Sequence, residues 1–211
     1  KAAPSLLESA AAGNEYSSMA VVSHKVATFL RQLGYQAANC GNDTALSVPQ
    51  AIAAGLGEIS RSGLLITQKY GPRVRLCKVF TDLELKADKP ITFGVQEFCK
   101  VCLKCADSCP SDAISREKEP GFNTNNISNI SGVKKWCIDA EKCYQFWREN
   151  GGGDCGSCIA SCPYNKMDEW HHSLSKVFAD TPAKPLLRYL DDAFGYGQVD
   201  NKKLAIEFWK K

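Results

Sequence analysis

The sequence predicts an α+β fold in three parts. An α+β domain spans residues 1–96, a small cysteine-rich domain spans residues 97–170, and residues 171–211 form a C-terminal segment that packs back on the core. Three observations lead to this prediction. Apolar residues recur at helical spacing near the start of the chain, two segments of strand-like composition follow them, and nine of the eleven cysteines lie within positions 99–162.

The composition is that of a soluble globular protein, with 44% hydrophobic and 23% charged residues over 211 positions. This length suffices for one substantial core or two small domains. A net charge of +3 is too small to indicate a nucleic-acid partner, so none is expected. No apolar run approaches the roughly 18 residues that a membrane span requires.

The first element predicted is an amphipathic helix over residues 16–33, which Gly34 ends. Its apolar residues recur at steps of three and four, and we interpret them as core packing rather than as a cofactor face. They are Met19, Val22, Val26, Phe29, Leu30 and Leu33.

A turn at Gly41–Asn42 and a short helix come next, with Ser47 as a candidate cap and Pro49 in the first turn. Residues 63–68 and 73–80 read as strands around the Gly71–Pro72 turn. The glycine-rich stretch 55–63 matches neither a phosphate loop nor a dinucleotide fingerprint, so it is a weak signal for phosphate binding.

The C-terminal part predicts a helix followed by a loop over residues 164–182, and then two apolar segments around residues 195–197. Three histidines occur, at positions 24, 171 and 172. No pair of them is spaced i, i+4 with a carboxylate between, so the sequence does not support a zinc site built on histidine.

The strongest motif is "CKVCLKCADSCP", residues 99–110. Zinc ribbons use separated Cys-x-x-Cys pairs, whereas three cysteines at successive two-residue gaps, then a fourth after three residues and Pro110, form the bacterial ferredoxin run. In that run the first three cysteines bind one 4Fe–4S cluster and the fourth reaches the other. With "CGSCIASCP" at 155–163, the first cluster takes Cys99, Cys102, Cys105 and Cys162.

The second cluster then takes Cys109, Cys155 and Cys158, and needs a fourth ligand, because the regular position holds Gly152. Cys143 is preferred over Cys137 because it directly precedes the glycine loop that returns to Cys155. Cys40, Cys77 and Cys137 are then expected to be buried small apolar residues. A disulfide framework is the rejected alternative. Two clusters carry single electrons, either in a ferredoxin-type carrier or for chemistry elsewhere in the chain.

Four segments, at 15–37, 47–85, 98–115 and 154–166, together resemble the C-terminal half of the corrinoid-dependent reductive dehalogenases of organohalide-respiring bacteria. The resemblance spans roughly residues 14–170 and includes "YGPRVR" and both cysteine motifs. The epoxyqueuosine reductases, which modify tRNA and share the corrinoid and both clusters, are the second family that the chain resembles.

This resemblance implies a cobalamin-type corrinoid in a nitroreductase-like domain, of which residues 1–96 form a part. Electrons from the clusters then drive removal of halide from a small organohalide, and a tyrosine supplies the replacing proton beside a cation that favours its phenolate. The matching residues are Tyr16, Arg75 and, from a weaker local match, Asn42. Tyr16 could instead anchor a helix start, and Arg75 could pair with a surface carboxylate.

The resemblance also implies a cellular setting. Members are longer, begin with a twin-arginine export signal and serve as terminal reductases of organohalide respiration, and their N-terminal half is absent from this chain. We therefore expect the extracytoplasmic face of the cell membrane, a membrane anchor protein or quinol-linked electron donor, and a possible homodimer.

Overall fold

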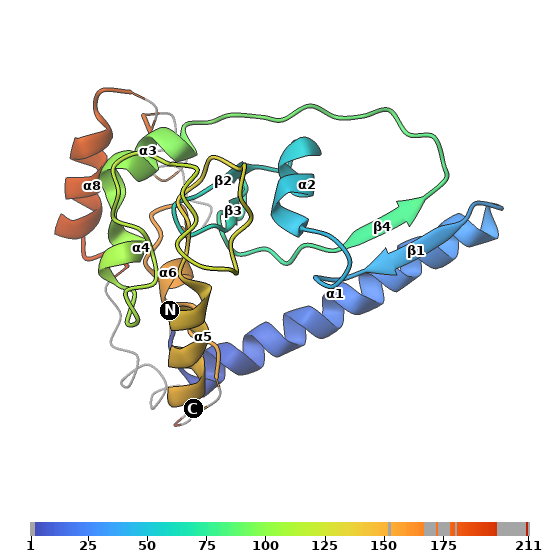
Figure 1. Ribbon diagram of the computed structural model, residues 1–211, viewed down its shortest axis with the longest axis horizontal. Helices are drawn as coiled ribbons and strands as arrows, with labels where there is room; N and C mark the ends of the chain where they lie inside the picture. Colours follow the sequence, from blue (N-terminus) through green and yellow to red (C-terminus); the bar gives the residue numbers. More distant parts are fainter. Residues whose placement is uncertain are drawn as a thin grey trace.

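The computed structural model describes residues 3–151, 153–166, 172, 178–179, 181–197 and 210. A long helix, α1 (Leu6–Gln32), lies along one side, and the strands β1 (Ala37–Cys40) and β4 (Lys78–Thr81) lie against its C-terminal half (Figure 1). The short helices that carry the cysteines gather at the opposite end of the molecule. No helix in the described ranges is both long and apolar enough to cross a membrane.

Helix α1 is ten residues longer at its start than the sequence predicts. Ser5 caps it, because the Ser5 side chain accepts a hydrogen bond from the Glu8 amide. The added turns are rich in alanine, which favours helix without adding to an apolar periodicity. The predicted end is confirmed: Gly34 adopts the left-handed conformation, with φ 94°, and the Tyr35 amide donates to the Leu30 carbonyl.

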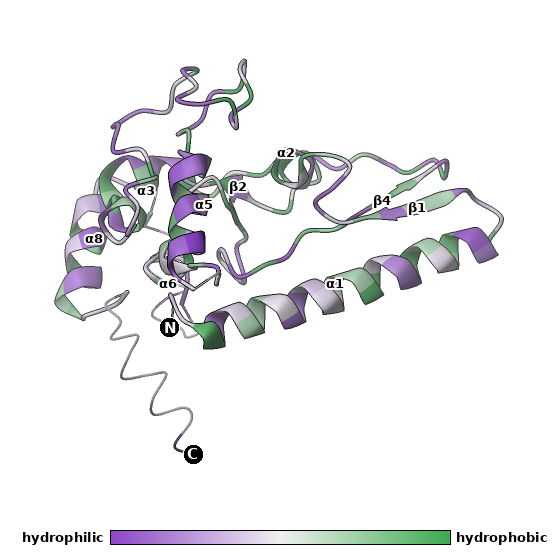
Figure 2. Cartoon of the chain, turned by 60° about the horizontal axis from the view of Figure 1, so that its bottom comes forward, coloured by the Kyte–Doolittle hydropathy of each residue, from purple (hydrophilic) through white to green (hydrophobic). Residues whose placement is uncertain are grey.

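The apolar stripe of α1 does not pack in the core of this chain, so that prediction is wrong. Four of its side chains are exposed, whereas the small residues Ala12, Ser23 and Ala27 are buried. Ser23 and Ala27 lie in the half of the helix that β1 and β4 contact, where small side chains allow a close approach, so the bulky residues lie on the face that these strands leave uncovered. Apolar and polar residues alternate along this edge helix in Figure 2. The exposed members are Val22, Val26, Phe29 and Leu33.

The strands form two separate antiparallel pairs. In one pair Ala37 lies opposite Thr81, and in the other β2 (Glu58–Ile59) pairs with β3 (Leu65–Ile66). The two predicted strands are therefore shorter than expected and belong to different sheets. Gly71 explains the separation: it forms a bridge with Thr67 and lies against the backbone of Tyr164, so the chain leaves β3 before it can pair with β4.

Helix α2 (Ser47–Ala53) forms where the sequence predicts it, but Ser47 is not its cap. Leu46 is the N-cap residue and makes no side-chain capping bond. The Ser47 hydroxyl instead donates to Asn42 Oδ1 (3.4 Å) and accepts from Lys78 Nζ (2.9 Å). Ser47 thus ties α2 to the loop after β1.

Five helices frame the cysteine-rich part: α3 (Val95–Cys102), α4 (Lys104–Asp107), α5 (Ala140–Glu149), α6 (Ser157–Ala160) and α8 (Lys184–Ala193). Most of the helix predicted after Cys162, and the second apolar segment of the tail, lie outside the described residues. The main core lies between these helices and β3. It consists of Ile66, Val95, Phe98, Cys102, Tyr164 and Ala179.

Gly71 offers a test of this packing. A Cβ atom there would lie 2.1 Å from the Tyr164 carbonyl oxygen, at a φ of +59°. We expect Gly71→Ala to lower the free energy of unfolding of the full-length protein by about 2–5 kcal/mol, from left-handed strain plus displacement of the Tyr164 backbone. Gly132→Ala is the control, because φ is +81° there but nothing lies within 4 Å. It should cost only about 1–2 kcal/mol. Equal shifts in thermal unfolding would contradict the close approach.

Candidate functional site

The eleven cysteines are all free thiols, so the disulfide alternative is rejected. Eight of them form two neighbouring sets. The first set comes from α3, from α4 and from the turn after α6, and the second from the segment after α4, from α5, from the segment before α6 and from α6 itself. The first set is Cys99, Cys102, Cys105 and Cys162, and the second set is Cys109, Cys143, Cys155 and Cys158.

Thiols of the first set are desolvated and lie within one another's electrostatic reach. Burial raises the pKa of Cys99 to about 11 and that of Cys102 to about 12. Burial also raises the pKa of Cys105 and that of Cys162, and both experience the charges of Cys99 and Cys102. Such thiols ionise at neutral pH only where a cationic centre compensates the charge, as a bound metal or cluster does. The donor set therefore fits an iron–sulfur cluster.

Two thiols of the second set share these properties. Burial first, and then Cys155, Cys143 and Cys109, raise the pKa of Cys158 to about 12. Burial followed by Cys109 and Cys155 raises the pKa of Cys143. Cys143 is thus the upstream thiol that lies beside Cys158. The charge of Cys158 also acts on Cys105, which places the two sets next to each other.

The remaining three cysteines have different surroundings. Cys137 and Cys40 are buried, as predicted for small apolar residues, whereas Cys77 is only partly buried. Among the described residues, no three Cys, His, Asp or Glu side chains converge in the arrangement that would hold a single metal ion.

The backbone repeats one feature in both Cys-x-x-Cys turns. Leu103 lies between Cys102 and Cys105 with φ 57°, and Gly156 lies at the same place in the second turn with φ 60°. A left-handed leucine costs about 1–2 kcal/mol, and such strain is found mostly where function requires the turn. In the second set, the Ala113 amide also donates to Cys109 Sγ (3.3 Å). Local backbone geometry therefore orients both sets.

Residues 55–63, the weak phosphate signal, form the support of the first set. The buried Glu58 carboxylate accepts from the amides of Phe93 and Val95, so it caps the start of α3. Fully buried Arg61 donates to the Cys99 carbonyl from Nε (3.1 Å) and from a terminal nitrogen (2.8 Å). Sequence reasoning missed both residues, because their partners lie more than thirty positions away.

Arg61 has three further contacts that complete its surroundings. Its other terminal nitrogen donates to the carbonyls of Ser115 (2.8 Å) and Glu117 (2.7 Å). Its guanidinium carbon lies 4.6 Å from the centre of the Trp136 ring. Arg61 thus joins α3 to the segment that follows the second set's first cysteine.

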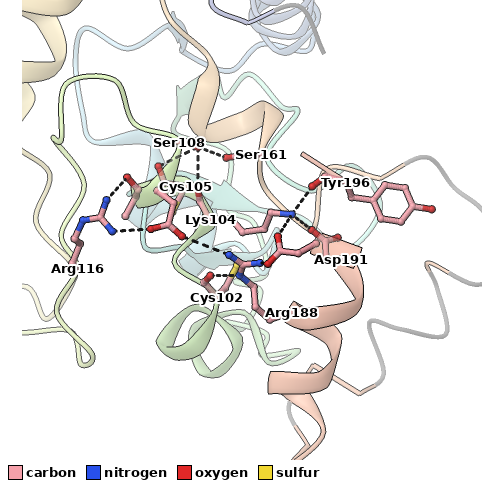
Figure 3. A network of polar contacts seen from close by, with 12 residues as sticks. Cys102, Lys104, Cys105, Ser108, Arg116, Ser161, Arg188, Asp191 and Tyr196 are labelled. Carbon is pink, nitrogen blue, oxygen red and sulfur yellow. Dashed lines mark hydrogen bonds and ion pairs between the residues drawn. The ribbon is translucent and has the colours of Figure 1, made fainter. Parts of the chain in front are cut away.

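A buried network of charges ties α8 to the first set (Figure 3). Lys104, which lies between Cys102 and Cys105, pairs with Asp191 of α8 and donates to the Tyr196 carbonyl. Arg188 Nε donates to the Cys102 carbonyl. The lysine and Asp191 are both buried, and their charges are compensated within this network, in which Asp191 also pairs with Lys166 and Lys104 with Asp192.

The predicted catalytic residues Tyr16, Asn42 and Arg75 come together from α1, the loop after β1 and the segment before β4. Asn42 Nδ2 donates to the Tyr16 hydroxyl oxygen (3.3 Å), and the Arg75 guanidinium carbon lies 4.5 Å from the centre of the Tyr16 ring. Tyr16 is 42% exposed. Because Asn42 supplies a donor to this oxygen, the phenolic proton is free for another acceptor.

The structure bears differently on the simpler explanations of these two residues. Tyr16 lies in the middle of α1 and does not anchor the helix start. Arg75 lies over the Tyr16 ring, and its charge also reaches the partly buried Glu8. Burial and the Asp154 carboxylate raise the pKa of Glu8, whereas Arg75 lowers it. Glu8 therefore interacts both with Arg75 and with Asp154, which directly precedes Cys155 of the second set. This places the Tyr16–Arg75 pair on the side of the second set.

Comparisons with known proteins agree with this geometry. Residues 98–166 match the family model of the 4Fe-4S dicluster domain. The chain is 50% identical over 211 residues to tetrachloroethene reductive dehalogenase of Desulfitobacterium hafniense, and 42% identical over 209 residues to that of Sulfurospirillum multivorans. Each alignment covers 98% of this chain, but 38% and 41% of the relative. The chain therefore spans about two fifths of the length of these relatives.

A solved structure agrees as well. A reductive dehalogenase described for B12-dependent dehalogenation superposes with a TM-score of 0.75 at 32% identity, over 87% of this chain and 26% of that one. The second family named above is more distant: epoxyqueuosine reductase of Lactococcus garvieae is 28% identical over 169 residues, which is 79% of this chain and 44% of the relative. The likeness is thus stronger to the dehalogenating relatives.

Proposed function

Because the chain shares its sequence and its fold with the reductive dehalogenases, we propose that the full-length protein removes halide from a small organohalide. The observation that carries this proposal is the combination within one fold of two buried cysteine sets and the Tyr16–Asn42–Arg75 group. The sets suit the delivery of electrons, and the tyrosine group suits the delivery of a proton. Reductive dehalogenation requires both.

The cofactor assignment follows the two sets. Cys99, Cys102, Cys105 and Cys162 would hold one 4Fe–4S cluster, and the second set, including Cys143, would hold the other. Residues 1–96 would contribute to a nitroreductase-like domain that holds a cobalamin-type corrinoid. When bound, the two clusters would supply single electrons and the corrinoid would supply a reduced cobalt centre for cleavage of the carbon–halogen bond.

The residues of this chain supply the proton. Two electrons and one proton convert the organohalide to its hydrogen-substituted product: the carbon–halogen bond breaks, halide leaves with its electron pair, and a carbon–hydrogen bond forms. Tyr16 would donate that proton from its hydroxyl. The charge of Arg75 would stabilise the phenolate that remains. Asn42 would hold the phenolic oxygen and help to orient the substrate.

The cellular role proposed is that of a terminal reductase of organohalide respiration on the extracytoplasmic face of the membrane. A membrane anchor protein or a quinol-linked donor would deliver electrons, and the protein could pair as a homodimer. These proposals rest on the resemblance to the respiratory dehalogenases. The slight net charge of +3 gives no support for a nucleic-acid partner.

Metal analysis combined with turnover tests this function. The full-length protein, purified anaerobically, should contain about eight irons and one cobalt per chain and release chloride from a chlorinated ethene with a reduced dye as donor. Iron without cobalt or turnover would favour a ferredoxin-type carrier. Cobalt with reduction of an epoxyqueuosine-containing tRNA and no chloride release would favour the other family.

A further inference from the structure

Arg61 is a buried cation whose hydrogen bonds all end on backbone carbonyls. Its side chain is fully buried, and the carbonyls of Cys99, Ser115 and Glu117 together with the Trp136 ring surround it. Carbonyl dipoles and a ring face lower the cost of burying a guanidinium, but they carry no full negative charge. A counter-charge therefore has to come from a neighbouring group.

The first cysteine set can supply this counter-charge. Desolvation lowers the pKa of Arg61, and the thiols whose charges oppose this effect are Cys105, Cys99 and Cys102. Two of the guanidinium nitrogens also hold the Cys99 carbonyl. Arg61 thus touches the backbone of one member of the set and lies within electrostatic reach of three.

The other cations near the first set already have carboxylate partners. Lys104 pairs with Asp191 and Asp192, and Arg188 pairs with Asp107 and Asp192. Because these carboxylates offset the charges of Lys104 and Arg188, the two cations have a weaker electrostatic effect on the first set. Among the described residues, Arg61 is a buried cation beside the first set that has no ion pair with a carboxylate. The buried Glu58 carboxylate also acts on Cys99, but it accepts from the amides of Phe93 and Val95.

Two carboxylates lie beside the second set, and Arg75 is a cation that reaches one of them. Glu8 and Asp154 interact with each other, and a Cβ atom on Gly156, between Cys155 and Cys158, would lie 2.7 Å from a Glu8 carboxylate oxygen. Net charge, hydrogen bonds and solvent exposure set the reduction potential of an iron–sulfur cluster. A nearby buried cation favours the reduced, more negative state, and carboxylates disfavour it.

We propose that Arg61 is a positioning residue that fixes the Cys99 peptide, and that its charge, which is paired with no carboxylate, makes the cluster of the first set the more easily reduced of the two. This inference rests on the proposed function, because it presupposes a cluster in each set. It assigns an order to the two centres: the cluster of the first set accepts an electron before the cluster of the second set.

The test is a redox titration of the full-length holoprotein followed by electron paramagnetic resonance. Arg61→Gln should make reduction of one centre at least tenfold less favourable, which is about 59 mV for one electron. Arg116→Gln is the matched control, because Arg116 also contacts a backbone carbonyl but is exposed and paired with Asp107. It should leave both potentials unchanged. Arg61→Lys keeps the charge and should retain most of the potential, while the lost hydrogen bonds lower the thermal midpoint.

A second measurement does not depend on a stable Arg61 variant. In the parent protein, the centre that is reduced first should be the one whose spectrum changes in Cys105→Ser and not in Cys158→Ser. The role of Arg61 would be overturned by the opposite assignment, or by equal potentials for Arg61→Gln and Arg116→Gln with both centres present. Neither of these results would affect the cluster assignment. Absence of both cluster signals from the parent would overturn the cluster assignment itself, and this inference with it.

Discussion

Replacing Tyr16 with phenylalanine is expected to reduce turnover of a chlorinated ethene by the full-length protein about 10²–10⁴-fold, the usual worth of a general acid. The substitution keeps the ring on which Arg75 lies and removes only the transferable proton. Because Tyr16 makes its hydroxyl contact with Asn42 at a partly exposed position, the fold and the iron and cobalt contents should not change. The measurement is chloride release per cobalt.

The chain contains a matched control for this experiment. Tyr70 is also exposed and also has a cation over its ring, Lys69 Nζ at 5.3 Å from the ring centre. Tyr70→Phe should leave turnover unchanged. Arg75→Lys should impair turnover less than Arg75→Ala, since lysine keeps the charge but loses the planar guanidinium. If Tyr16→Phe retains turnover within about twofold of the parent, the proton comes from another group.

The second large effect concerns the irregular ligand of the second set. Cys143→Ser should remove one cluster and so lower the iron content from about eight to about four per chain. Cys143 acts on Cys158 together with Cys155 and Cys109, and Cys143 is only partly buried. Iron determination on anaerobically purified protein, together with the loss of one of two resonance signals, measures this change.

Cys137→Ser is the control for that loss. Cys137 lies six positions before Cys143 and is buried, and we assign it no ligand role. Both clusters should remain, although a buried hydroxyl in place of the thiol lowers stability. Iron loss in the Cys137 variant alone would show that the ligand assignment is wrong.

Sequence reasoning worked best where the signal is local. The end of α1 at Gly34 follows from backbone chemistry within a few residues, and the helix over Ser47–Ala53 does so as well. That the two cysteine sets ligate clusters remains a prediction. The structure nevertheless brings together the eight thiols that the spacing assigned to two groups. The order of cysteines in a ferredoxin run already contains this information.

The parts that could not be predicted depend on contacts distant in sequence. Helical periodicity identified an apolar face on α1, but it cannot say what covers that face, and Val22 and Phe29 remain exposed here. Arg61 lies in a glycine-rich stretch that reads as a loop, and its role becomes visible only through Cys99 and Glu117, 38 and 56 positions away. Pairing of β1 with β4 is equally non-local.

The interleaving of the two cysteine sets has a consequence for biosynthesis. The first set begins at Cys99 but ends at Cys162, and the second set ends at Cys158, just before it. A ribosome adding about 5–20 residues per second needs roughly 3–13 s to pass from Cys99 to Cys162. During that interval neither set is complete, and the early thiols can be oxidised. Both sets then become complete almost simultaneously, so iron loading of one is coupled in time to loading of the other.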